Sequence, residues 1–131
     1  MRDAVIVIAE TLELAAARVA DPTAAIFARL FAEIPDAEAL FVRDTGGLVR
    51  GQMFQVTMES LLDFLGDKDY GANLIQIERV NHQGLGVEPE MFDRFYWTVM
   101  AAFKDILGDD WTDEHEAVWT RTVGELTGQA A

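Results

Sequence analysis

Residues 82–89 read HQGLGVEP and form a short corner between two predicted helices. Apolar residues at helical spacing over residues 72–82 predict a helix that ends at His82. Pro89 favours the start of the next helix, because its fixed φ angle suits the first helical turn and its missing N–H is not needed there. Apolar side chains at helical spacing continue this second helix over residues 89–107. The corner therefore joins two helices, and His82 stands at the junction.

Helical periodicity extends over the remainder of the chain, and no alternating strand pattern competes with it. Asp21 is expected to cap the second helix, which Pro22 begins and Pro35 ends. Asp113 and Glu116 form the pattern of a capping box at the start of the last helix. The predicted helices cover residues 2–19, 22–34, 48–65, 72–82, 89–107 and the segment from 113 onward. Residues 1–131 are therefore predicted to form a single all-α domain, with helices packed at several angles around one core.

The charge and composition of the chain narrow the function classes. There are 23 acidic and 10 basic residues, which gives a formal net charge of −13 at pH 7. Nucleic acids and anionic membranes carry negative phosphates and would repel such a chain, so neither is expected as a partner. The absence of cysteine excludes disulfide scaffolds, thiolate catalysis and iron–sulfur or cysteine-zinc sites. Ser60 is the one serine, and its place within a predicted helix offers no nucleophile elbow.

The apolar run near the N-terminus is short. Residues 4–9 are apolar, but Asp3, Glu10 and Glu13 flank them closely, unlike the charge pattern of a signal peptide. No run approaches the roughly 18 apolar residues that a membrane span requires. A mature, soluble, cytoplasmic protein is the expectation.

His82 allows two interpretations. A structural one is that its imidazolium near a helix C-terminus interacts favourably with the helix dipole. The other is metal ligation, because aromatic side chains are concentrated on both sides of it in the sequence. These are Phe27, Phe31, Phe41 and Phe54 upstream, and Phe92, Phe95, Tyr96 and Trp119 downstream. A flat apolar cofactor with one axial imidazole requires an apolar slot of this kind.

Two segments of the chain, taken with their order and spacing, resemble the globin family. Residues 26–41, IFARLFAEIPDAEALF, are similar to the family's second helix and the corner after it. Residues 82–92, HQGLGVEPEMF, look like its proximal histidine, glycine corner and following helix. The resemblance extends over residues 23–126 and looks closest to bacterial single-domain globins and the haem domain of flavohaemoglobins. It implies a globin fold of six to eight helices around a haem pocket.

The resemblance also implies roles for individual residues toward haem b (iron protoporphyrin IX). His82 would be the axial ligand of the haem iron, and Phe41 would wedge against the porphyrin face. Further contacts implied by the resemblance are Phe27 overlooking the bound gas, Val87 and Phe92 on the proximal side, and Trp119 behind the pocket.

The distal side depends on the register of the predicted helix over residues 48–65, and two registers are possible. The first places Arg50 over the iron and Phe54 one turn later, with Met58 continuing the same stripe toward the cofactor. The second places Gln52 over the iron and Val56 one turn later. The first is preferred, because it continues an apolar core stripe. Arg50 in that register either donates to the bound gas or lies in solvent and reaches a haem propionate.

The implied function is a haem-binding globin that reversibly binds a diatomic gas, dioxygen in the first place. An alternative is detoxification of nitric oxide by bound dioxygen, for which an external reductase would be needed. Phe27 and Phe92 argue against it, because flavohaemoglobins carry tyrosines at these positions. A third alternative is a globin-fold sensor or scaffold without haem. A monomer and a homodimer are both compatible with the sequence.

Four further side chains complete these expectations. Glu78, one turn before His82, either accepts the second imidazole N–H or is a surface carboxylate. His115 is expected to have a packing or surface role. A methionine ligand to the iron from Met53 or Met58 is a minor alternative to a vacant distal position.

Overall fold

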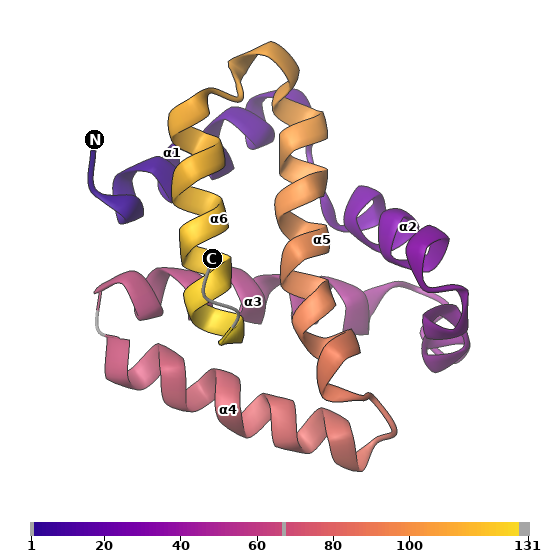
Figure 1. Cartoon of the computed structure of the whole chain (residues 1–131). Helices are drawn as coiled ribbons and strands as arrows, with labels where there is room; N and C mark the ends of the chain where they lie inside the picture. Colours follow the sequence, from indigo (N-terminus) through magenta and orange to yellow (C-terminus); the bar gives the residue numbers. More distant parts are fainter. Residues whose placement is uncertain (1, 67, 129–131) are drawn as a thin grey trace.

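The computed structural model describes residues 2–66 and 68–128, without the side chains of 68–74, and this part of the chain contains helices and no strand. The helices are α1 (Ala4–Arg18), α2 (Thr23–Glu33), η1 (Pro35–Phe41), α3 (Leu48–Gly66), α4 (Lys68–Gly84), α5 (Pro89–Leu107), η2 (Gly108–Asp110) and α6 (Asp113–Thr127), where η marks a short 3₁₀ helix. Figure 1 shows their order. The predicted all-α class is confirmed.

The predicted helix boundaries were correct at α5 and wrong at the fourth and last helices. The fourth helix extends from Lys68 to Gly84 rather than from residue 72 to His82. The last helix is capped by Thr112, not by a box of Asp113 and Glu116. Thr112 Oγ1 accepts the backbone N–H of His115 at 3.2 Å, and His115 Nδ1 accepts the backbone N–H of Thr112 at 3.0 Å. An imidazole nitrogen thus replaces the usual carboxylate of a capping box.

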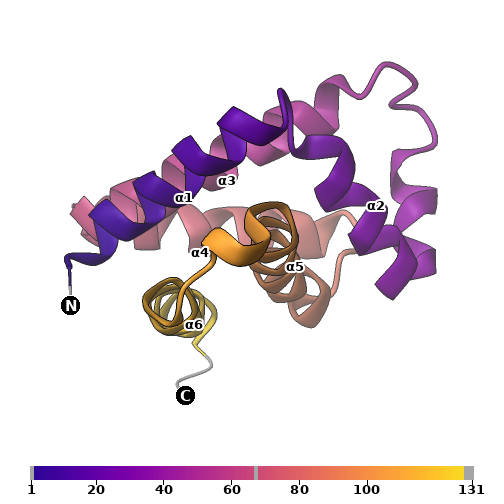
Figure 2. The same cartoon turned by 90° about the horizontal axis from the view of Figure 1, so that it is seen from above.

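α5 is the central helix of the fold, with buried side chains along most of its length. α1 and α6 pack on α5 and on each other. α3 and α4 lie side by side, and α4 packs on α5 (Figures 1 and 2). α2 packs on α5 and α3, and η1 packs on α2 (Figure 2). None of the helices among the described residues is long and apolar enough to cross a membrane. The arrangement leaves α3, α4, α5 and η1 to surround the candidate site.

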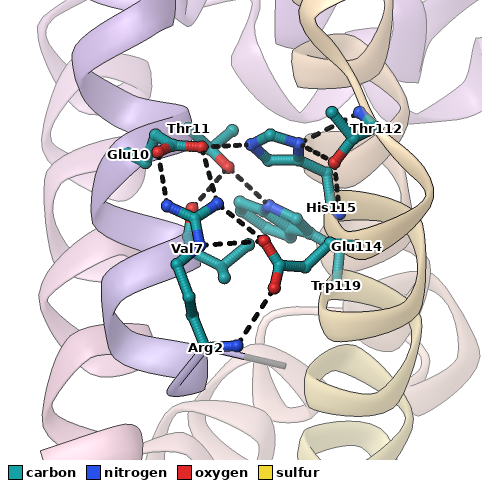
Figure 3. A network of polar contacts seen from close by, with 8 residues as sticks. All are labelled: Arg2, Val7, Glu10, Thr11, Thr112, Glu114, His115 and Trp119. Carbon is teal, nitrogen blue, oxygen red and sulfur yellow. Dashed lines mark hydrogen bonds and ion pairs between the residues drawn. The ribbon is translucent and has the colours of Figure 1, made fainter.

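A polar network, here called the N-terminal clasp, joins α1 to α6 and consists of Arg2, Glu10, Glu114 and His115 (Figure 3). Arg2 donates to Glu10 at 2.6 Å and to Glu114 at 2.7 Å. His115 is 2% exposed, and its Nε2 lies 3.0 Å from a Glu10 carboxylate oxygen. The hydrogen bonds from Arg2 lower the pKa of both glutamates. The packing role expected for His115 matches this buried position.

Trp119 continues the contact between α6 and α1 beneath the clasp. It is fully buried, and its indole N–H donates to Thr11 Oγ1 at 2.9 Å. Thr11 in turn donates to the carbonyl of Val7 at 2.9 Å. The buried polar atoms of this contact are therefore satisfied, as a stable interior requires.

Candidate functional site

A cavity of about 620 Å³ opens between η1, α3, α4 and α5. This volume lies within the roughly 300–1,000 Å³ that is typical of sites for small molecules and cofactors. Four apolar side chains on its wall, Leu40, Val49, Val56 and Leu85, are also exposed, by 41% to 75%. Exposed apolar side chains gathered around one opening indicate a surface that an apolar ligand covers.

His82 lies on the wall of this cavity, near the C-terminal end of α4. Its Nδ1 lies 2.7 Å from the backbone carbonyl oxygen of Glu78, one turn earlier. The carboxylate of Glu78 is farther from Nδ1, at 3.8 Å. The close carbonyl selects the tautomer in which Nδ1 carries the proton and donates. Nε2 then has a free lone pair, and it has no partner among the side chains that the structure describes. This is the state of a histidine that is ready to bind a metal.

The glycine corner after His82 holds the ring in this place. The His82 carbonyl accepts the N–H groups of Leu85 at 3.0 Å and Val87 at 2.9 Å, which closes the end of α4. Gly86 has a φ angle of 91°, in the left-handed region that residues with a Cβ atom avoid. The chain can therefore turn sharply enough for Val87 to lie on the cavity wall beside His82.

The start of α5 forms the side of the cavity next to His82. The rings of His82 and Phe92 lie 5.1 Å apart, and Phe92 lines the cavity. Beside them, Arg79 of α4 donates to Asp93 of α5 at 2.6 Å. Burial raises the pKa of Asp93, and the Arg79 cation opposes this rise without cancelling it. The ion pair connects α4 to α5 and so fixes the distance between His82 and Phe92.

A cluster of Phe27, Phe31, Phe41 and Phe95 closes the end of the cavity near η1. Phe41 and Phe95 line the cavity, whereas Phe27 is 2% exposed and lies behind them. The ring of Phe27 is 5.3 Å from that of Phe41 and 5.4 Å from that of Phe95. Phe41 is therefore part of the cavity wall, and Phe27 supports it from behind without reaching the cavity.

The two predicted registers of α3 are distinguished by which side chains reach the cavity. Gln52 and Val56 line it, and Arg50 does not. Arg50 instead donates through Nε to the Asp44 carboxylate at 3.1 Å and through Nη2 to the Asp44 carbonyl at 2.9 Å. The cavity wall thus contains the residues of the second register, Gln52 and Val56, and not the Arg50 of the preferred first register. The physical reason that Arg50 is absent from the wall is its ion pair with Asp44 in the preceding turn. Helical periodicity gives no information about such a pair.

Three other residues predicted to contact the cofactor lie outside the cavity wall. Phe54 and Trp119 both pack on Phe103 of α5, with ring centres 6.2 and 5.6 Å from it. Met58 is buried in the core, 8% exposed. These side chains lie on the face of α3 and α6 that meets the interior of the bundle, which accounts for the apolar stripe seen in the sequence.

Tyr96 is a polar residue of the cavity wall, for which the sequence predicted no role beyond its place among the aromatic side chains. It is 5% exposed and lies one turn after Phe92 on the same face of α5, with the two rings 5.8 Å apart. Its hydroxyl has no hydrogen-bond partner among the described residues. Burial raises the pKa of Tyr96, and the carboxylates of Glu78 and Asp93 raise it further. Its spacing from Phe92 was the signal that could have revealed it.

The globin family model matches residues 24–130, from the second residue of α2 to the end of α6 and beyond. No curated protein and no solved structure matches the chain. The family match covers most of the chain and agrees with its all-helical fold. The chain therefore belongs to the globin family.

Proposed function

We propose that this globin binds haem b in the cavity, with His82 as the axial ligand, and that it reversibly binds a diatomic gas, dioxygen in the first place. The observation that carries the proposal is the imidazole of His82. Its Nδ1 is occupied by the Glu78 carbonyl at 2.7 Å, its Nε2 is without a partner among the described side chains, and its ring lines an apolar cavity of about 620 Å³.

The side chains around His82 fit a metal that brings its own ligands. Among the described residues there is no group of three or more histidine, cysteine, aspartate or glutamate side chains that could hold a bare ion. A single imidazole on an apolar wall is what a porphyrin iron requires, since the porphyrin supplies the other four nitrogens. The exposed apolar rim, which includes Leu40 and Leu85, would then be covered by the flat ring.

When bound, haem would supply an iron that can take a diatomic gas. Gln52 of α3 is the residue we assign to the gas, because it lines the cavity and carries a neutral amide donor. A hydrogen bond from such a donor contributes about 0.5–1.5 kcal/mol to ligand stability. Val56 and Met53 are apolar side chains of α3 that line the cavity beside Gln52.

Within the family we place the chain nearest to bacterial single-domain globins and flavohaemoglobin haem domains, on the resemblance of residues 26–41 and 82–92. Phe27 packs behind the cavity wall and Phe92 lies beside His82, and neither carries a hydroxyl. Since the polar groups that activate dioxygen are missing at these two positions, binding and release of the gas is the proposed role rather than nitric-oxide detoxification.

The test is a haem titration of the purified protein, followed by spectra of the oxidised, reduced and carbon-monoxide-bound forms. His82→Gly should lose stable haem uptake, because the axial nitrogen is removed, and added imidazole should restore it. Gln83→Ala, which changes the exposed neighbour, should bind haem as the unchanged protein does. An undiminished Soret band in His82→Gly without imidazole, or a protein that stays colourless with haem, would overturn the proposal.

A further inference from the structure

The turn before α3 contains a compact polar cluster built on Asp44. The Asp44 carboxylate accepts the backbone N–H groups of Val49 at 3.1 Å and Arg50 at 3.0 Å, which caps the start of α3. It also accepts the Arg50 Nε at 3.1 Å, and the side chain of Asp44 is only 7% exposed. The same residue lines the cavity. The Asp44 carboxylate at the cavity wall thus both caps α3 and pairs with the Arg50 guanidinium.

This cluster keeps Arg50 folded back over the turn. Gly47 has a φ angle of 73°, and a Cβ atom there would lie 3.4 Å from Arg50 Nη2, so the guanidinium lies directly over this glycine. The residue before Arg50, Val49, and the residue one turn after it, Met53, both line the cavity. The backbone of Arg50 is therefore beside the cavity, and the bonds to Asp44 are what direct its side chain elsewhere.

Release of Arg50 would change the chemistry of the distal wall. A guanidinium has a long flexible stem and strong donors, and it binds anions far better than a neutral amide does. The arginine that does line the cavity, Arg43, is exposed and lies in the segment before the turn. With Arg50 withheld, the distal donor on α3 is the uncharged Gln52.

We propose that Asp44 is a specificity-determining residue, which holds Arg50 out of the cavity so that the distal wall accepts neutral diatomic ligands and disfavours anions. This inference rests on the proposed function and adds the ligand class that the site rejects. Burial alone would raise the pKa of Asp44, but its hydrogen bonds from Val49 and Arg50 outweigh burial and lower it. Asp44 is therefore ionised at neutral pH, and Arg50 is held there.

The first arm of the test is azide binding to the ferric haem-loaded protein, followed through the Soret band. Asp44→Asn keeps an oxygen that can cap α3 but removes the charge that holds Arg50. We expect azide affinity to rise about tenfold, which is the effect of one added charge-assisted hydrogen bond. The double variant Asp44→Asn with Arg50→Gln should return to the original affinity. Asp63→Asn makes the same charge change at an exposed position on α3 and should have no effect.

The second arm needs no haem. The apolar sulfonate dye 8-anilinonaphthalene-1-sulfonate should bind the haem-free cavity of Asp44→Asn more tightly than that of the unchanged protein or the double variant. If the chain takes up no haem, the proposed function fails while this arm still tests the pair. Asp44→Ser, another capping residue, replaces Asp44→Asn if that variant loses helical circular dichroism. Equal anion affinity with and without Asp44, or the same gain in the double variant, would overturn the inference.

Discussion

The α1–α5–α6 side of the molecule and the cavity between α3, α4 and α5 are built on opposite principles. On the first side, Trp119 and Phe103 are at most 1% exposed, and the polar atoms of Thr11 and Trp119 are bonded to each other. On the second side, apolar residues such as Val49 and Leu85 are exposed around an open volume of about 620 Å³. Protein side chains fill the interior of the first side, whereas the second side leaves an open volume with the size of a ligand site.

This difference separates stability from function within one small domain. Side chains that fill space tightly contribute most when they are fully surrounded, because removal leaves a cavity that cannot collapse. Truncation of a side chain that already borders open space should reduce the free energy of unfolding by less, because it creates little new cavity. α5 belongs to both sides, since its first half lines the cavity and its second half packs on α1 and α6. Substitutions along this one helix can therefore test the contrast.

The largest expected effect is on the free energy of unfolding of the haem-free protein when Phe103 is replaced by alanine. Phe103 is 1% exposed and packs on both Phe54 and Trp119, so Phe103→Ala should cost about 3–5 kcal/mol. Phe92→Ala, the matched change on the cavity half of α5, should cost clearly less. Urea unfolding followed by circular dichroism measures both. Equal losses would remove the contrast between the two sides.

The next effect is stabilisation of the cavity side by haem. At a free haem concentration of 100 times Kd, binding should stabilise the folded state by about 2.7 kcal/mol. Hydrogen exchange should show the added protection in α3 and α4, whose side chains line the cavity, more than in the contact of α1 with α6. His82→Gly without imidazole serves as the control and should show no such gain. An equal gain of hydrogen-exchange protection in all helices would contradict the contrast between the cavity side and the α1–α5–α6 side.

The smallest effect concerns acid and the N-terminal clasp. Arg2 lowers the pKa of Glu10 and Glu114 in the folded state, so these carboxylates favour folding above their ordinary pKa of about 4.3. That contribution is lost as the pH falls through their lowered values. Arg2→Gln should therefore reduce the fall in stability at acid pH, measured as urea midpoints from pH 6 to pH 3. Arg121→Gln removes a more exposed pair with Glu125 as a control, and an acid response equal to that of Arg2→Gln would count against the clasp.

The comparison also shows where sequence patterns are informative. The glycine corner, Pro89 and the helical spacing of α5 are local features, and the structure has this helix at the predicted residues 89–107. The partners of Arg2 are not local, because Glu114 is 112 residues away in the chain. α1 lies before the residues that match the globin family, yet the clasp and Trp119 attach it to α6.

Helical periodicity by itself determined that this chain is all-α and that His82 lies near the end of a helix that precedes a glycine corner, because backbone geometry depends on neighbours along the chain. Only the tertiary structure decided that Gln52, and not Arg50, lines the cavity. Both lie on the same helix, and the difference between them arises from the Asp44 carboxylate and from the packing of α3 on α4, which set the side chains that meet the open volume. A face becomes a cavity wall only when another element leaves space opposite it, and that depends on residues that are distant in sequence.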